Sequence, residues 1–440
     1  MQSVARASVE IIGIVKGRAG AAFLTACVIA SPAAVRAADP IVEWNEIAVK
    51  VSLAAVVNGR ALSPVEQTRA MAIVHVAVHD AVNAVTGRYE QYRRTDDAEA
   101  GASAEAAAIA AAYRALLGLF GDAHFGDTAF LTSAYVASLA QHGVPDDDPG
   151  LAAGFATADG ILALRQADGS ASASYPYVPV NAGLPGIWVP LTSAASAQAL
   201  LPGWGGVAPW VLRKGSQFRP DAPPALDSER YARDYQEIKE VGARVNHSRT
   251  DEQTNIALFW RASPIAIWSP ILRAALEAHD LDLSSSARIA ALVNLAASDA
   301  SVAVWEAKYF YNYWRPQPAI VNGDSDGNPL TEGQADWLPH LPTPAHPEYP
   351  SAHAANSAAM AFVMRAFFGD APGFDIEATS ATAAGFVRHW STFSEGVEEV
   401  IDARVYSGIH FRTADEVGAR QGRQVARFVL IHALRSAKKR

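Results

Sequence analysis

Three segments of the chain carry side chains that could hold and transform a small anion. The first is "WEAKYFYNYWRP" (305–316), in which Lys308 and Arg315 are seven residues apart. On one α-helix this spacing brings both side chains to the same face, two turns apart. Because the intervening residues are mostly aromatic, the segment is predicted to be buried, and buried cations need an anionic partner. The alternative is a pair of solvated bases on an exposed face.

The second segment, "HPEYPSAHAANSAA" (346–359), predicts the start of a helix. Pro350 and Ser351 precede a helix that begins at Ala352, and the free N–H groups and positive dipole end of a helix suit an anion. His353 lies in the first turn, where an imidazole can give or take a proton near neutral pH. Alone, this pattern is also that of an ordinary serine cap.

The third segment, "ARVYSGIHFRTADEVG" (403–418), places Arg404 six residues before His410, with Gly408 between them. The glycine would let the histidine leave the helix and face an anion. Asp415 is predicted to reach the other ring nitrogen of His410, which would fix its tautomer and raise its basicity. A lone histidine near a glycine is more often structural, so this segment indicates a functional site only in combination with the other two.

Together the segments supply one lysine, two arginines, a serine, helix N–H groups and two histidines. This set suits a tetrahedral or trigonal-bipyramidal oxyanion. The cations would neutralise equatorial oxygens, while one histidine takes an apical position and the other acts on the opposite apical oxygen.

The order Lys-x6-Arg-Pro, Pro-Ser-(Gly)-His and Arg-x5-His resembles the pattern of vanadium-dependent haloperoxidases and of the related acid phosphatases of the type-2 phosphatidic acid phosphatase superfamily. The resemblance is densest from about residue 300 to 420. It implies that vanadate binds through His410, with His353 as the acid–base group for hydrogen peroxide and Asp415 behind His410. It further implies that the anion's oxygens are held by Lys308, Arg315, Ser351, the Ala352 amide and Arg404.

Two further positions favour the haloperoxidases. Trp305 resembles a tryptophan found one turn before the lysine, and His346 stands where chloroperoxidases tend to have phenylalanine, as in bromoperoxidases. The implied reaction is oxidation of a halide, with bromide favoured, to hypohalous acid or its equivalent, which then reaches a small organic acceptor.

Two alternatives stay open at this point. In a secreted acid phosphatase of the same superfamily, His410 would be the nucleophile that forms a phosphohistidine, and His353 would protonate the leaving group. A non-catalytic oxyanion-binding helical protein would keep the cations, although binding alone does not need His353. Two departures from the family pattern are Ala352, in place of the usual glycine, and Asp415, five rather than four residues after His410.

The elements that must position these residues are predicted to be helices. Apolar periodicity predicts an all-α protein, and the resemblance implies two four-helix bundles. We expect a helical half over 38–240 and a second half over 241–440 that carries the site. The predicted helices cover 68–85, 101–120, 249–260, 284–314, 352–368 and 414–439.

About sixty residues, from Ala167 to Leu226, are rich in Pro, Gly, Ser and Trp instead. Irregular connections of that length are uncommon unless they cover a site or link domains. One interpretation is an ordered cover across the bundle near the site, and the other is a loop between the two halves.

Residues 1–37 have the pattern of a secretory signal, with a basic start, the apolar run "AAFLTACVIA" and small residues before Ala38. The run is too short for a permanent membrane span. A lipoprotein signal acylated at Cys27 is the alternative. We therefore expect an exported protein, periplasmic or secreted, that loses its single cysteine on cleavage.

The formal net charge is −9, and loss of residues 1–37 would make the chain still more acidic. An acidic chain is a poor candidate for binding nucleic acid. Large helical faces are compatible with a homodimer. His75 and His79 have a helical spacing that could ligate a metal, but without a third ligand motif a buried structural role is expected.

Overall fold

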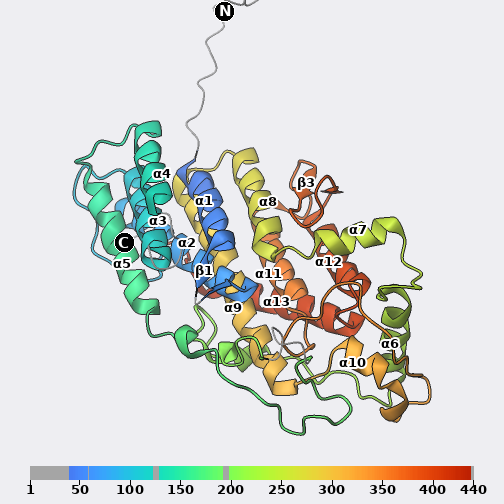
Figure 1. The fold of residues 1–440 in the computed structure, drawn as a ribbon. Helices are drawn as coiled ribbons and strands as arrows, with labels where there is room; N and C mark the ends of the chain where they lie inside the picture. Colours follow the sequence, from blue (N-terminus) through green and yellow to red (C-terminus); the bar gives the residue numbers. More distant parts are fainter. Residues whose placement is uncertain (1–38, 58, 122–127, 192–197, 438–440) are drawn as a thin grey trace, which may run out of the picture. The chain divides into compact units, whose positions relative to one another are not determined.

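Helices dominate the secondary structure, which confirms the prediction of an all-α protein. The computed structural model describes residues 39–57, 59–121, 128–191 and 198–437 (Figure 1). The predicted signal over 1–37 lies outside these residues. The α-helices are α1 (Pro40–Ala54), α2 (Pro64–Thr86), α3 (Ala104–Phe120), α4 (Thr128–Gln141), α5 (Pro149–Arg165), α6 (Glu229–Val241), α7 (Asp251–Phe259), α8 (Pro264–Ala278), α9 (Leu283–Tyr311), α10 (Pro316–Val321), α11 (Ala352–Phe368), α12 (Phe393–Tyr406) and α13 (Arg412–His432).

The remaining regular elements are short. Two antiparallel hairpins are formed by β1 (Val56–Val57) with β2 (Arg60–Ala61) and by β3 (Ile376–Thr379) with β4 (Val387–Trp390). Four 3-10 turns complete the set: η1 (Ser170–Ser172), η2 (Trp204–Gly206), η3 (Gly215–Phe218) and η4 (Gly323–Ser325).

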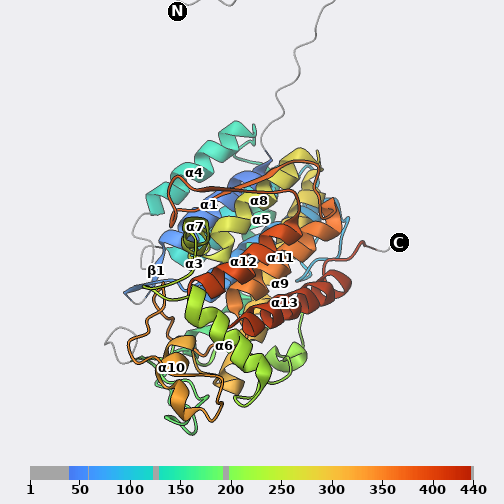
Figure 2. The same cartoon turned by 90° about the vertical axis from the view of Figure 1, so that its right-hand side faces the viewer.

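The helices pack in two groups that meet along α2 and α9. In the first group α2, α3 and α5 contact one another, with α1 and α4 against them, and in the second α9, α11 and α13 do so, with α12 and α8 alongside (Figures 1 and 2). Small residues allow this close packing. A Cβ atom at Gly422 on α13 would overlap the backbone of Ala355 on α11, and one at Gly418 would overlap the carbonyl oxygen of Ser351. The helix that carries the serine–histidine motif is thereby held against α13.

Helix α9 is long and apolar enough to cross a membrane by length and composition, yet 94% of its most apolar window is buried inside the protein. Its carboxy-terminal end differs from the sequence prediction, which extended one helix to residue 314. The helix ends at Tyr311 because Asn312 adopts a left-handed conformation (φ 48°), and Arg315 caps the following helix α10. Lys308 and Arg315 therefore do not share a helix, so helical periodicity was the wrong reason to expect them to meet.

The Pro- and Gly-rich segment lies along α9 where the structure describes it. The carboxylate of Asp299 on α9 accepts hydrogen bonds from the backbone N–H groups of Trp210, Val211 and Leu212, at 2.6, 2.8 and 2.9 Å. Further along α9, the carbonyl oxygen of Leu200 accepts from the indole of Trp305. These contacts support an ordered cover that reaches the site. The division into halves at residue 240 stays a prediction.

Replacement of Asp299 by alanine should destabilise the protein by at least about 3 kcal/mol, because three backbone donors, two of them buried, lose their acceptor. Denaturant unfolding measures this change. The exposed Asp97, replaced in the same way, serves as the control and should shift the midpoint little. Equal stability of the two variants would show that Asp299 does not anchor the segment.

Candidate functional site

The three predicted segments converge in the structure, and Lys308 forms the first link. Its side chain is fully buried, and its ammonium donates hydrogen bonds to the backbone carbonyl oxygens of Pro347 (3.0 Å) and Glu348 (2.8 Å). The first segment thus contacts the loop that leads to Ser351. On the other side, the Ser351 N–H donates to the carbonyl oxygen of Ala414, in the third segment.

Arg315 joins all three segments through a buried guanidinium. Its Nε donates to the carbonyl oxygen of His346 (2.9 Å), and one terminal nitrogen lies 2.9 Å from Nδ1 of the His346 ring. The other terminal nitrogen donates to the carbonyl oxygen of Ile409 (2.7 Å) and lies 3.1 Å from Nε2 of His410. The guanidinium therefore bridges the two loops that carry the histidines.

The turn between α7 and α8 holds the remaining cation and the acid–base candidate. Arg404 donates to the carbonyl oxygen of Trp260 (3.0 Å), and Nε2 of His353 lies 3.2 Å from the carbonyl oxygen of Ala262. Trp260 is fully buried, and its indole donates to the carboxylate of Glu399. Sequence analysis missed this turn, because backbone carbonyls leave no residue-type signal.

His410 lies between α12 and α13, as Gly408 predicts. Gly408 has a φ of 76°, and a Cβ atom there would overlap the carbonyl oxygen of Gly242. The carboxylate behind His410 is not the expected one, however. Nδ1 of His410 lies 2.9 Å from Oε1 of Glu348, so the contact predicted for Asp415 was assigned to the wrong residue. Glu348 comes from the second segment, close in space and distant in sequence.

Asp415 is fully buried on the first turn of α13. Neither of its carboxylate oxygens, nor the hydroxyl of Ser351, has a hydrogen bond of standard geometry. Burial raises the pKa of Asp415 well above its usual value, against the lowering influence of Ser351 and Arg404. The raised pKa favours the neutral form of Asp415, so this residue offers Arg404 little charge balance, and a catalytic role for it stays a prediction.

Ala352 begins helix α11, a conformation that alanine adopts readily, so the glycine usual in the family is not required here. The amide N–H groups of a first helical turn have no partner within the helix and suit an anion. Trp305 and His346 lie side by side, with ring centroids 4.8 Å apart. The residues expected near the halide are thus adjacent to each other and, through Arg315, to His410.

Burial keeps the histidines neutral, and the two guanidinium groups keep the site cationic, whereas burial and the charge of Arg315 lower the pKa of Lys308 well below its usual value. Burial, followed by the charges of Arg315 and Lys308, lowers the pKa of His410 and of His346 well below the usual value. Burial and Arg404 do the same for the pKa of His353. Burial also lowers the pKa of Arg315 and of Arg404 to about 10, which leaves both guanidinium groups charged at neutral pH.

The unpaired polar atoms show that these residues fit an oxyanion. The buried Nε of Arg404 has no hydrogen-bond partner among the described residues, and the buried Oγ of Ser351 has none of standard geometry, although it interacts with the carboxylate of Asp415. Buried polar groups are normally paired, so unpaired ones need an explanation. Both atoms can donate, and an anion held by the neighbouring cations would supply the missing acceptors.

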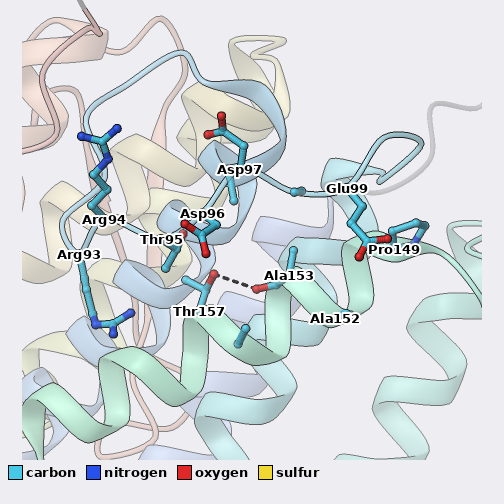
Figure 3. Close-up of a pocket in the computed structure, with 13 residues that line it drawn as sticks. Arg93, Arg94, Thr95, Asp96, Asp97, Glu99, Pro149, Ala152, Ala153 and Thr157 are labelled. Atoms are coloured by element: carbon cyan, nitrogen blue, oxygen red, sulfur yellow. Dashed lines mark hydrogen bonds between the residues drawn. The ribbon is translucent and has the colours of Figure 1, made fainter.

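Two other places in the fold are poor candidates. His75 and His79 are buried, and their rings contact the side chains of Asn45 and Asn83, respectively. No group of three or more His, Cys, Asp or Glu residues could hold a metal ion in the described part of the chain. A surface pocket between the 93–99 loop and α5 is lined by exposed charged side chains of both signs, among them Arg94 and Asp97 (Figure 3).

Comparison with known proteins agrees with this geometry. Residues 288–439 match the family model of the VCPO second helical-bundle domain. A bacterial vanadium-dependent iodoperoxidase of known structure is 26% identical, with a TM-score of 0.74 over 91% of this chain and 97% of that chain. No curated protein sequence matches this chain at a significant level.

Two structures of bacterial vanadium-dependent chloroperoxidases share the fold. An apo form is 18% identical, with a TM-score of 0.66 over 84% of this chain and 93% of that chain. A holo form is 19% identical, with a TM-score of 0.67 over 88% of this chain and 96% of that chain.

Acid should destabilise the protein through His75 and His79. Burial lowers the pKa of each to about 4, whereas an unfolded histidine titrates near 6.5. As the pH falls from 6.5 to 4, only the unfolded chain takes up these protons, so stability is lost by up to about 3 kcal/mol per histidine. Urea unfolding across this range should give a shallower pH dependence for His75→Gln than for the wild type. An unchanged slope in that variant, matching the exposed control His389→Gln, would contradict the assignment.

Phosphate or vanadate should raise the thermal midpoint of the protein, because an anion that binds only the folded state stabilises it by about 2.7 kcal/mol at 100 times its Kd. Lys308→Ala should largely remove this stabilisation. Lys239 also donates to a backbone carbonyl, but outside the site, so Lys239→Ala is the matched control. Chloride at equal ionic strength separates specific binding from salt effects. An equal response of both lysine variants to the oxyanions would rule out the site.

Proposed function

This chain belongs to the vanadium haloperoxidase superfamily, and we propose that it is a vanadate-dependent haloperoxidase that oxidises halide, preferably bromide, with hydrogen peroxide. The observation that carries this proposal is the gathering of three buried basic side chains around His410, with Arg315 at 3.1 Å from Nε2 and an Nε of Arg404 that has no acceptor among the described residues. The family match over residues 288–439 includes Lys308, Arg315, Arg404 and His410.

Lys308, Arg315 and Arg404 would hold the negative oxygens of vanadate, with the hydroxyl of Ser351 as a further donor. His410 presents Nε2, whose lone pair is not protonated because burial, followed by the neighbouring cations, lowers the pKa of the ring. When bound, vanadate supplies a Lewis acid that activates hydrogen peroxide without a change in its oxidation state. The remaining chemistry, orientation and proton transfer, belongs to the protein.

His353 is suited to proton transfer by its contact with the α7–α8 turn. The carbonyl oxygen of Ala262 can only accept, so Nε2 of the neutral ring carries the hydrogen and Nδ1 keeps its lone pair. Nδ1 can take a proton from hydrogen peroxide and return it to the oxygen that leaves as water. In sum, peroxide, halide and one proton give hypohalous acid and water, and the hypohalous acid then reacts with a small organic acceptor.

Bromide is favoured by the residue at position 346. The His346 ring is polar, is contacted by Arg315 and lies against Trp305, where the chloroperoxidase pattern has phenylalanine. Bromide and iodide are easier to oxidise than chloride. The iodoperoxidase named above is also more similar in sequence to this chain than the chloroperoxidases are.

We further propose that the protein acts after export and that residues 1–37 direct it there. The basic start, the short apolar run and the small residues before Ala38 support this proposal. A homodimer stays a proposal that follows from the large helical faces. Fractionation of cells that express the full chain, together with sizing of the purified protein, tests both proposals.

The direct test is halide oxidation by purified protein before and after addition of vanadate, with iodide, bromide and chloride in parallel. We expect activity with iodide and bromide, only with both vanadate and peroxide, and little with chloride. His410→Ala should lower the activity by at least about 100-fold, because the anion loses its histidine partner. His432→Ala, at an exposed position on α13, is the control and should retain wild-type activity.

The same samples distinguish the alternatives. Turnover of a phosphomonoester that vanadate abolishes, without halide oxidation, would replace the proposal with a phosphatase that uses His410 as nucleophile. Anion binding with neither activity would indicate a binding protein. Preferred oxidation of chloride would contradict the role given to His346.

A further inference from the structure

We propose that Glu348 is a positioning residue that fixes the tautomer and orientation of His410, so that Nε2 presents its lone pair to the bound oxyanion. This inference rests on the proposed function for its consequence, but the geometry stands by itself. The residue lies in the second segment, between His346 and Ser351, where its side chain has no part in the pattern that suggested the family.

The carboxylate of Glu348 ties the side chain of His410 to the adjacent backbone. Its Oε1 lies 2.9 Å from Nδ1 of His410 and accepts the N–H of Phe411, also at 2.9 Å. Both Glu348 and His410 are almost fully buried, so water does not compete for these contacts. One oxygen atom thus fixes the ring and the start of the chain that leads into α13.

The contact on the other ring nitrogen of His410, Nε2, requires the same tautomer. A terminal nitrogen of Arg315 lies 3.1 Å from Nε2 of His410, and a guanidinium has only donors. Nε2 must therefore accept, which places the hydrogen of the neutral ring on Nδ1. Oε1 of Glu348 already accepts the N–H of Phe411, so it is an acceptor at that position as well, and two independent partners agree.

Glu348 is itself held by the parts of the site that bind the anion. Its carbonyl oxygen accepts from the ammonium of Lys308 (2.8 Å), and its N–H donates to the carbonyl oxygen of Tyr313 (2.9 Å). The main chain of this one residue is thus fixed to the end of α9, while its side chain is fixed to His410. A shift of Lys308 or of His410 would be transmitted to the other through Glu348.

The second oxygen of Glu348 has no hydrogen-bond partner and belongs to the lining of a narrow internal gap that Tyr231 and Asp234 also line. Folding alone does not require a buried carboxylate here, since apolar residues of similar volume often replace buried ions without loss of stability. The oxygen of Glu348 that does have partners is Oε1, which contacts His410. This points to a role at the imidazole.

The experiment is 15N NMR of histidine-labelled protein without vanadate, with the His410 signals assigned by comparison with His410→Gln. We expect wild-type His410 to carry its hydrogen on Nδ1. Glu348→Gln keeps an acceptor at Oε1 and should keep this tautomer, whereas Glu348→Ala and the larger Glu348→Leu should give a mixture of tautomers. Tyr231→Phe, which removes only a hydroxyl from a residue that lines the same gap, is the matched control and should behave as the wild type.

The second readout is vanadate affinity, measured by the concentration dependence of the thermal midpoint. Loss of such a partner typically weakens binding about 10- to 100-fold, so Glu348→Ala should show that loss and Glu348→Gln should restore most of it. A merely structural role would lower the midpoint of the vanadate-free protein without this rescue.

The hydrogen on Nε2 in the wild-type protein would overturn the proposal, even if no Glu348 variant folds. Unchanged tautomer and affinity in a folded Glu348→Ala or Glu348→Leu variant would do the same. If wild-type protein binds no vanadate, the proposed function fails, but the tautomer measurement on the free protein still decides the role of Glu348.

Discussion

The structure depends on one constraint: three basic side chains, two of them charged guanidinium groups, must lie together in a dry interior before any anion arrives. Desolvation and mutual repulsion both oppose this arrangement. Lys308, Arg315 and Arg404 are tolerated because each donates to backbone carbonyl oxygens. Burial raises the pKa of two nearby carboxyl groups, to about 8 for Glu348 and well above the usual value for Asp415, so neither offsets much of this charge at neutral pH. The positive charge and the unpaired donors that remain would allow the site to bind an oxyanion.

The fold meets this constraint because turns and loops lie at the ends of the buried helices, where their carbonyl groups can accept hydrogen bonds from the basic side chains. Carbonyl groups inside a helix are already paired, so the acceptors for the cations must come from turns. They come from the loop before α11, from the α7–α8 turn and from the chain after Gly408. Close packing of α11 on α13, which the glycines of α13 permit, fixes the distance between two of these sources. The segment anchored at Asp299 then covers the side that carries Trp305.

The three histidines share one environment and differ in the partner that orients them. His353 faces a backbone carbonyl, His346 faces Arg315, and His410 lies between Arg315 and Glu348. Burial and the cations keep all three neutral, so their differences come from which ring nitrogen is free. Under the proposed function, the carbonyl partner of His353 leaves Nδ1 free for proton transfer, and the carboxylate partner of His410 leaves Nε2 free for the anion.

The sequence by itself determined most of the helices and the residue types that meet at the candidate site. Apolar periodicity and the cap before Ala352 are local signals, and the start and end of α11 follow from them. The motif residues could be identified because each lies within a short segment of recognisable spacing. Asp415 was expected behind His410 for the same reason, since it is near in sequence.

Only the tertiary structure decided which groups are partners. Glu348 and His410 are 62 residues apart, and Arg404 and Trp260 are 144 residues apart. The left-handed Asn312 ends α9 early and changes how Arg315 reaches its partners. Contacts across such separations arise from how helices pack and how loops cross. No spacing rule encodes them, because the chain between two such residues can take many paths until the core closes.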